Sequence, residues 1–240
     1  MATFVIVHGM FDGGWSWRRV GALLRATGHE VYTPTLTGLG ERVHLAHPGI
    51  DLETHIADIV NLLYCEDLTD VRLVGHSLAG LIITGVADRA SERLARLIYL
   101  DAHVPENGES FLDLVGEERR AMMEQVVHER GDGWRLPPPS IASDPGADSQ
   151  ATAEMWRWFQ PRLAPQPFKT LTQQVRLTHP TVASLQRAYI LCAKDHTGGF
   201  EPRMERIHSN PAWRWREIDA DHLAHVTAPE TLVNALLELV

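Results

Sequence analysis

Six short apolar runs alternate with helical patterns along the chain, and this alternation constrains the fold more than any other feature. Between the runs lie stretches with apolar residues at helical spacing, such as 51–66 and 229–240. Near-continuous apolar strands separated by helices are typical of a parallel sheet covered on both faces. The sequence therefore predicts an α/β fold with a roughly six-stranded, mainly parallel sheet. The six runs are TFVIVHG (3–9), EVYTP (30–34), DVRLVGH (70–76), RLARLIYLDA (93–102), RAYILCAKD (187–195) and WRWREID (213–219).

The alternation stops between about residues 105 and 185. This stretch contains no buried-strand run and holds most of the prolines, together with the aromatic segment EMWRWF. A structureless loop of this length is implausible in a compact domain. We therefore expect a helical cap at 105–185, inserted into an α/β core formed by residues 1–104 and 186–240.

Composition narrows the range of partners. The 240 residues carry a formal net charge of -9, which disfavours nucleic acid and anionic membranes, since both require clustered positive charge. The start lacks the basic and long apolar regions of a signal peptide, and no apolar stretch is long enough for a membrane span. We expect a cytoplasmic protein in which Cys65 and Cys192 are reduced thiols.

Chemically active side chains follow the predicted strands where the strands end. Ser77 follows the third strand, Asp101 the fourth, Asp195 the fifth and His222 the sixth. Ligands of open parallel sheets bind beyond these carboxyl ends. The chain order serine, aspartate, histidine is that of the α/β-hydrolase triad, in which histidine removes the serine proton and the carboxylate orients the histidine.

Ser77 lies in the segment GHSLAG, which departs from the G-x-S-x-G nucleophile turn only by Ala79 at the last glycine. The alternative is that Ser77 is an ordinary helix N-cap. Two N–H groups are needed to stabilise a tetrahedral intermediate, and we expect them from Leu78 and from Met10 in the turn after the first strand.

Two positions have competing candidates. Asp195 is the predicted triad acid, with Asp101 as its alternative, and His222 is the predicted base, with His225 as its alternative. The histidine pairs 222/225 and 44/47 lack a third ligand at metal spacing, so no metal is expected. Phe11 and Trp156 are candidate substrate-pocket residues.

The chain resembles the α/β-hydrolase superfamily, and within it the plant methylesterase and hydroxynitrile lyase family with its bacterial esterase relatives. The resemblance implies that Ser77 is the nucleophile, Asp195 the acid and His222 the base, with the N–H groups of Met10 and Leu78 as the oxyanion hole. It also implies a helical cap, an enzyme without a cofactor and a possible homodimer. The segments that carry it are VHGMFDGGWSWRRV, LLRATGHEVYTPTLTGLGER, LVGHSLAG, DAHVPENGES, RLAPQPFKTLTQQVRL, YILCAKDHT and DADHLAHVTAPE.

Two further positions separate esterases from lyases within this family. The lyases carry a threonine and a lysine where this chain has Gly9 and Leu223, and the lysine holds the leaving cyanide. Neither Gly9 nor Leu223 has a side chain that donates a hydrogen bond. The sequence thus predicts a serine esterase acting on a small-molecule carboxylic ester through an acyl-enzyme. A C–C lyase and a non-catalytic ligand receptor on the same fold remain the alternatives.

Overall fold

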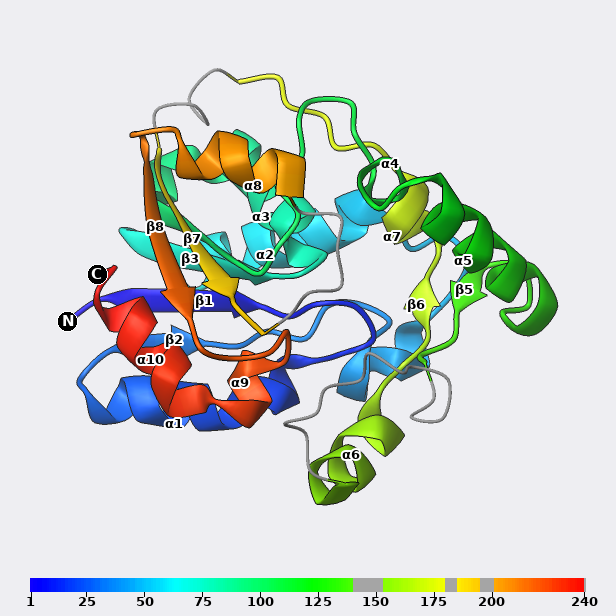
Figure 1. The fold of residues 1–240 in the computed structure, drawn as a ribbon, viewed down its shortest axis with the longest axis horizontal. Coiled ribbons are helices and arrows are strands. Elements are labelled where there is room, and N and C mark those ends of the chain that lie inside the picture. Colours follow the sequence, from blue (N-terminus) through cyan, green and yellow to red (C-terminus); the bar gives the residue numbers. More distant parts are fainter. Residues whose placement is uncertain (140–152, 180–184, 195–200, 240) are drawn as a thin grey trace.

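A sheet of six parallel strands forms the centre of the protein, seen here in a computed structural model that describes residues 1–139, 153–179, 185–194 and 201–239 (Figure 1). The strands lie in the order β2-β1-β3-β4-β7-β8. Each of the six predicted runs forms one of them, and every pairing is parallel, so the predicted fold class is confirmed. The strands are β1 (Thr3–Val7), β2 (Glu30–Tyr32), β3 (Val71–His76), β4 (Leu94–Leu100), β7 (Gln186–Cys192) and β8 (Trp213–Ile218).

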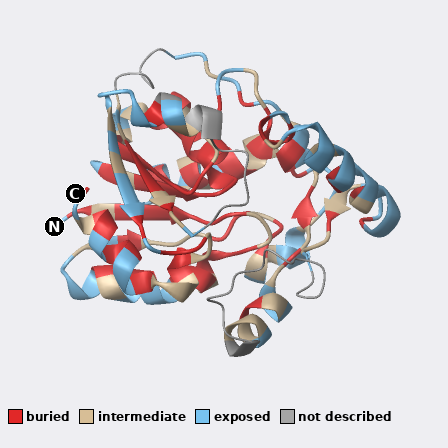
Figure 2. Cartoon of the chain, viewed as in Figure 1, coloured by how far each residue is buried: buried red, intermediate tan, exposed pale blue. Residues whose placement is uncertain are grey.

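Helices cover both faces of this sheet. Figure 1 shows α2 (Leu52–Cys65) and α3 (Ala79–Ala90) on one face, and α1 (Arg18–Ala26) and α10 (Pro229–Leu237) on the other. Successive side chains of a strand point to opposite faces, and each face has its own apolar cluster. In Figure 2 the central strands are therefore coloured as buried, whereas much of α5 and β8 is exposed.

Local sequence signals account for several helix ends. The Asp51 carboxylate accepts from the backbone N–H of Thr54 at 2.9 Å and caps α2. Helix α1 ends at Ala26 with Thr27 as its C-cap, and Gly28 follows with φ +86°, a conformation that glycine adopts without strain. Pro229 opens α10, where its missing N–H is not needed.

The described residues between β4 and β7 form an insert made mainly of helices. Its two strands are only two residues long and pair antiparallel to each other, outside the main sheet. In Figure 1 the insert lies on the side of the sheet toward which β1 points. Its elements are α4 (Phe111–Leu114), α5 (Glu117–Arg130), β5 (Arg135–Leu136), α6 (Ala153–Phe159), η4 (Gln160–Arg162), β6 (Gln166–Pro167) and α7 (Lys169–Thr172).

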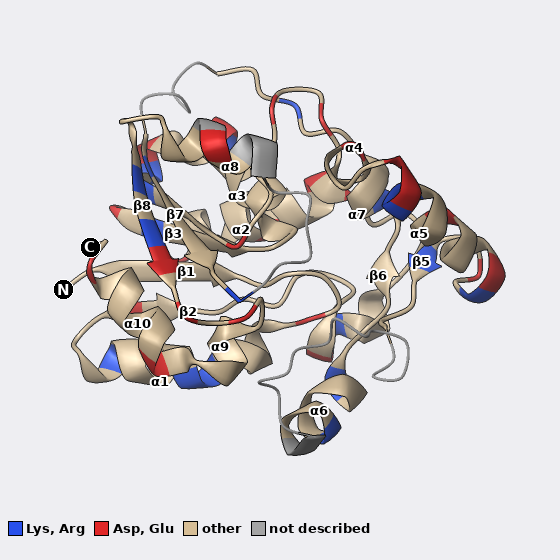
Figure 3. Ribbon diagram, viewed as in Figure 1, with Lys and Arg blue, Asp and Glu red and all other residues tan. Residues whose placement is uncertain are grey.

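Many of the charged residues lie on outer elements of the fold, such as α5 and β8 (Figure 3). The edge strand β8 carries Arg214, Arg216 and Glu217 in exposed positions, and charges on an edge discourage pairing with another chain. No helix within the described ranges combines the length and apolar character needed to cross a membrane. The remaining short helices are η1 (Gly14–Trp17), η2 (Gly40–Leu45), η3 (Ser91–Arg93), α8 (Glu201–His208) and α9 (Ala224–Thr227).

Two glycines let α3 lie close to the sheet. A Cβ at Gly75 would lie 2.8 Å from the carbonyl oxygen of Ala79, and a Cβ at Gly80 would lie 1.9 Å from the carbonyl oxygen of His103. Ala79 itself is wholly buried in the core. The close approach thus depends on the glycines at 75 and 80, which is why the chain accommodates a methyl group at position 79.

We predict that Gly80→Ala lowers the free energy of unfolding by about 3 kcal/mol, because the new methyl group overlaps a backbone carbonyl that is held in place. Urea denaturation followed by circular dichroism measures this. Gly21→Ala is the matched control, since the atoms nearest to a Cβ there belong to the far end of the Arg25 side chain, at 3.1 Å, and not to the backbone. That variant should keep or slightly raise the stability. Equal effects of the two substitutions would contradict the prediction.

Candidate active site

Ser77 occupies a strained turn between β3 and α3. Its φ is +56°, a left-handed conformation that a non-glycine residue rarely adopts. The turn is held by its own backbone: the Ser77 N–H donates to Leu100 at 3.2 Å, and the Ser77 carbonyl accepts from the N–H of His103 at 3.1 Å. The N-cap of α3 is Leu78, without a side-chain cap bond, so Ser77 is not the helix cap. The turn presents its side chain at the carboxyl edge of the sheet.

His222 is the histidine that reaches this edge. Its ring centroid lies 4.6 Å from that of His76, the neighbour of Ser77. The Nε2–H of His76 donates to the carbonyl of His222 at 2.8 Å and fixes the backbone there. About a third of the His222 side chain (34%) is exposed, which leaves it accessible to a substrate.

The alternative histidine, His225, faces the core. It is fully buried, its ring stacks on Trp17 at 4.4 Å, and its Nε2 lies 3.3 Å from a carboxylate oxygen of Asp12. Helix α9 begins at Ala224 and turns this side chain inward. The structure thus separates the two candidates: His222 borders the Ser77 turn, and His225 joins α9 to the turn after β1.

Asp101 accepts the hydrogen bond from His222. The His222 Nδ1 lies 2.6 Å from Asp101 Oδ2, and the Asp101 side chain is only 2% exposed. The second oxygen, Oδ1, accepts from the N–H of Cys192 at 3.3 Å. A buried carboxylate at Nδ1 leaves the opposite ring nitrogen, Nε2, as the basic one.

Of the two acids proposed from the sequence, the structure describes only Asp101. Asp195, the predicted acid, lies outside the described residues, and its role stays a prediction. Asp101, ranked second, holds the described bond. The physical reason is its backbone: Asp101 has φ +42° and its N–H donates to Ile190 at 2.8 Å, which turns the side chain back over the sheet edge.

The turn after β1 lies directly against Ser77. A Cβ at Gly9 would lie 3.1 Å from the Cβ of Ser77 and 3.0 Å from Nδ1 of His76. Met10 follows Gly9, and Leu78 follows Ser77. Among the described residues, none accepts a hydrogen bond from the backbone N–H of Met10 or of Leu78. Both predicted oxyanion donors therefore border the serine without an internal acceptor.

The two predicted pocket residues have different positions. Phe11 is half-buried in the turn after β1, next to Met10. Trp156 packs edge-on against Phe159 at 5.9 Å. Phe159 and Trp158 each lie 5.3 Å from Trp15, and Phe159 also lies 6.4 Å from His225. The pocket role of both stays a prediction, but the aromatic ring that α6 brings toward the core is that of Phe159.

Two buried histidines flank the site in their neutral form. Burial, together with the nearby rings of His222 and His225, lowers the pKa of His76 well below its ordinary value. Burial also lowers the pKa of His8, whose Nε2 accepts from the N–H of Leu36 at 3.1 Å. The ring of His8 must then carry its proton on Nδ1, which donates to the carbonyl of Gly9 at 2.9 Å. This bond supports the turn that carries Met10.

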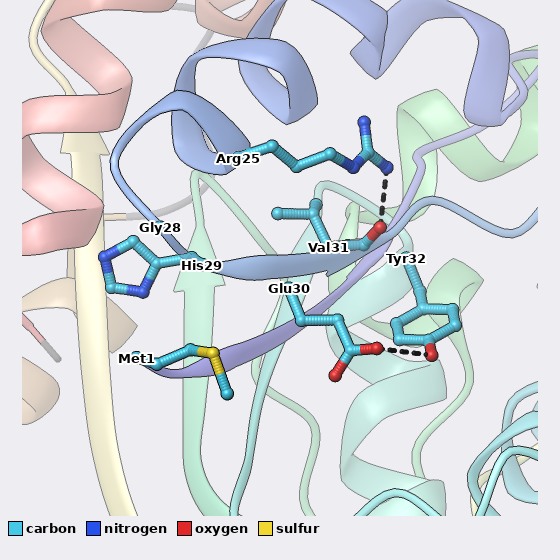
Figure 4. Close-up of a pocket in the computed structure, with 7 residues that line it drawn as sticks. All are labelled: Met1, Arg25, Gly28, His29, Glu30, Val31 and Tyr32. Carbon is cyan, nitrogen blue, oxygen red and sulfur yellow. Dashed lines mark hydrogen bonds between the residues drawn. The ribbon is translucent and has the colours of Figure 1, made fainter.

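Two surface recesses of the described part of the chain are lined by residues other than Ser77, Asp101 and His222. A recess of about 570 Å³, lined in part by Met1, Arg25 and Glu30, lies at the amino end of β1 and β2, opposite the edge that carries Ser77 (Figure 4). Another, of about 460 Å³, is lined in part by Trp15, Arg18 and Trp158. In the part of the chain that the structure describes, no three histidine, cysteine or acidic side chains could together hold a metal ion.

The amino-acid sequence matches a known protein family over almost its whole length. Residues 4–235 match the model of the "Alpha/beta hydrolase family". The chain is a member of the alpha/beta hydrolase family. The match covers the core strands, the insert and every residue of the site described above.

Several curated relatives of this alpha/beta hydrolase are named as esterases. It is 36% identical to a carbendazim hydrolyzing esterase of Nocardioides sp. (strain SG-4G), with all of both chains covered. It is 28% identical to pheophorbidase of Raphanus sativus, covering 99% of this chain and 93% of the relative. It is 26% identical to methyl jasmonate esterase 1 of Vitis vinifera, covering 99% and 96%.

Solved structures of similar proteins share the fold of this alpha/beta hydrolase over its full length. An extracellular alpha/beta-hydrolase from a Paenibacillus species superposes with a TM-score of 0.88 at 25% identity, covering 99% of this chain and 98% of the other. A pyrethroid hydrolase from Sphingobium faniae gives a TM-score of 0.74 at 22% identity, covering 99% and 96%, and supports the fold alone.

Sequence reasoning missed three buried polar side chains of this alpha/beta hydrolase, those of Asp12, Ser16 and Gln166. Asp12 accepts from the hydroxyl of Ser16 at 2.7 Å and contacts His225, and Gln166 contacts the backbone of Phe11. Polar residues of this kind usually lie on the surface, so their types gave no signal. Only their contacts across the fold identify them as part of the site.

We predict that the protein loses stability as the pH falls below about 6.5, the ordinary histidine value from which burial lowers the pKa of His76. Below this pH the folded state keeps the His76 ring neutral, whereas the unfolded chain binds a proton there. Unfolding therefore takes up a proton, and a lower pH favours the unfolded state. Each such histidine contributes a slope of about 1.4 kcal/mol per pH unit.

Urea denaturation between pH 7.5 and pH 5 measures this slope. His76→Gln keeps a donor for the His222 carbonyl but cannot be protonated. The free energy of unfolding of this variant should therefore fall less steeply with decreasing pH, by about 1.4 kcal/mol per pH unit, the contribution of one proton. An identical slope in the variant and the parent protein would show that His76 is not one of the groups responsible.

Proposed function

We propose that this protein hydrolyses small carboxylic esters through an acyl-enzyme formed on Ser77. The observation that carries the proposal is the placement of Ser77 on a left-handed turn beside His222, whose Nδ1 is bound by a buried carboxylate. The esterase names of the relatives support the same reaction class, including a relative that shares 36% of its residues.

The acylation step uses each group at a stated atom. His222 Nε2 removes the proton of Ser77 as Oγ attacks the ester carbonyl carbon. The negative charge then develops on the carbonyl oxygen, where the N–H groups of Met10 and Leu78 donate hydrogen bonds. When the C–O bond to the alcohol breaks, the protonated His222 returns its proton to the leaving oxygen.

Deacylation repeats the steps of acylation, with a water molecule as the attacking group. His222 Nε2 takes a proton from a water molecule as its oxygen attacks the acyl carbon, and the same two N–H groups bind the charged oxygen. Breaking the bond to Ser77 Oγ releases the carboxylic acid, and the serine regains its proton. The exposed third of the His222 side chain gives water a route to this nitrogen.

Asp101 is the carboxylate that we assign to this base. It fixes the imidazole with the proton on Nδ1 and stabilises the imidazolium in both steps. The support is its 2.6 Å contact with His222 and its second contact with the N–H of Cys192. Asp195 follows the neighbouring strand β7 and is the alternative.

The residues around the serine favour ester hydrolysis over C–C bond cleavage. Leaving cyanide would carry charge into a desolvated site, and Leu223 offers no cation to compensate it. A Cβ at position 9 would lie 3.1 Å from the Cβ of Ser77 and 3.0 Å from Nδ1 of His76, so the turn packs this closely on Ser77 because residue 9 is glycine. The charge of an ester intermediate instead falls on the carbonyl oxygen, beside the two backbone donors.

We predict that Ser77→Ala lowers kcat for p-nitrophenyl acetate by about 10⁴-fold or more and leaves the circular dichroism spectrum unchanged. The variant should also lose covalent labelling by a fluorophosphonate probe, which reacts with activated serines. Ser209→Ala, at an exposed serine, is the control and should keep full activity and labelling. A Ser77→Ala protein that retains more than a tenth of the activity would rule out Ser77 as the nucleophile.

We predict that Asp101→Asn reduces kcat by roughly 10³- to 10⁴-fold, because the amide favours the wrong imidazole tautomer. Asp195→Asn, measured in parallel on the same ester, is expected to reduce kcat by about tenfold or less, since the described bond to Nδ1 remains. The reverse ranking would assign the acid to Asp195 and would confirm the prediction from the sequence.

A further inference from the structure

We propose that Gln166 is a positioning residue that holds the oxyanion turn in its active shape. The inference deepens the proposed ester hydrolysis and rests on it. Gln166 belongs to the insert, in β6, and lies 155 positions from the residue that it holds. Its side chain is fully buried, so its amide is shielded from water.

The insert binds both backbone polar groups of Phe11. The N–H of Phe11 donates to Oε1 of Gln166 at 3.1 Å, and the carbonyl of Phe11 accepts from the N–H of Ala164 at 2.8 Å. Phe11 directly follows Met10, whose N–H is one of the two proposed oxyanion donors. Fixing the peptide that joins these residues limits the directions that the Met10 N–H can take.

The turn needs such a support because its backbone is unfavourable on its own. Phe11 has φ +66°, which brings the Cβ of an L-residue too close to its own backbone. Conformations of this kind persist only when surrounding contacts hold them. The pair of bonds from residues 164 and 166 is the contact that the structure supplies.

A second hydrogen bond fixes the orientation of the Gln166 amide. Thr170 Oγ1 donates its single proton to the carbonyl of Pro167 at 2.6 Å. It can therefore only accept from Gln166, whose Nε2 lies 2.8 Å away. The amide nitrogen is thus directed to Thr170, and the amide oxygen is left for the N–H of Phe11.

The test compares Gln166→Leu with Gln173→Leu. Gln173 is the matched control because its Oε1 also accepts a backbone N–H of the core, that of Glu53 at 3.1 Å, but at the start of α2. Steady-state hydrolysis of p-nitrophenyl acetate gives kcat and KM, and a trifluoromethyl ketone, which forms an oxyanion on the serine, measures the donor geometry. Hydrogen–deuterium exchange of peptides covering residues 8–14 reports the turn independently of activity.

We expect Gln166→Leu to lower kcat by about 10- to 100-fold with KM within about twofold, since a displaced donor stabilises the oxyanion poorly. The affinity for the trifluoromethyl ketone should fall by a similar factor, and the turn should exchange faster. A loss of packing alone would not weaken the binding of this inhibitor while KM stays nearly unchanged. Gln173→Leu should match the parent protein in all three measurements.

Parent-like kcat and parent-like exchange in Gln166→Leu would overturn the proposal. If that variant does not fold, Gln166→Asn replaces it, because its shorter amide stays polar but cannot reach the N–H of Phe11, and the same outcomes apply. Ser77→Ala serves as the blank in every assay. Absence of serine-dependent hydrolysis in the parent protein would reject the esterase proposal, while exchange of residues 8–14 would still decide the role of Gln166.

Discussion

The close packing of α3 on the carboxyl edge of the sheet is the constraint on which the rest of the site depends. Gly75 and Gly80 remove the side chains that would separate the helix from β3 and from the backbone of His103. The turn between them must then be sharp, and Ser77 takes the left-handed conformation at a cost of about 1–2 kcal/mol. Backbone hydrogen bonds to Leu100 and His103, each contributing about 1 kcal/mol, offset this cost.

The functional groups converge because parallel strands end at one edge. Ser77 follows β3, Asp101 follows its neighbour β4, and the turn with Met10 follows β1 on the other side. His222 approaches from the loop after β8 and is held from two sides, through its carbonyl by His76 and through its ring by Asp101. Each group is thus fixed by a different element, which restricts the freedom of the assembled site.

Buried polar side chains give this edge its rigidity. His8 and His76 stay neutral and use their ring protons to bind backbone carbonyls of the site, those of Gly9 and His222. Asp12 and His225 connect the turn after β1 with α9. Because buried groups of this kind are costly when unpaired, each bond opposes movement of the loop that it holds. The insert adds the hydrogen bond that Gln166 accepts from the N–H of Phe11.

The sequence by itself determined the six strands, their helices and the positions of Ser77 and His222. Buried strands and amphipathic helices have local patterns, and a residue that directly follows a parallel strand has a known place in space. The confirmed parallel sheet and the sharp turn at Ser77 follow from such local information, with Gly75 and Gly80 as the supporting signals.

The tertiary structure decided what local patterns leave open. Asp101 and Asp195 follow strands that pair with each other, so spacing could not choose between them. The folded chain brings the Asp101 carboxylate to the ring of His222, whereas Asp195 lies outside the described residues. The start of α9 turns His225 into the core, although it lies only three residues from His222. The contact between Gln166 and Phe11 joins residues 155 positions apart. Such choices depend on side-chain direction and on long-range packing, which only the folded chain defines.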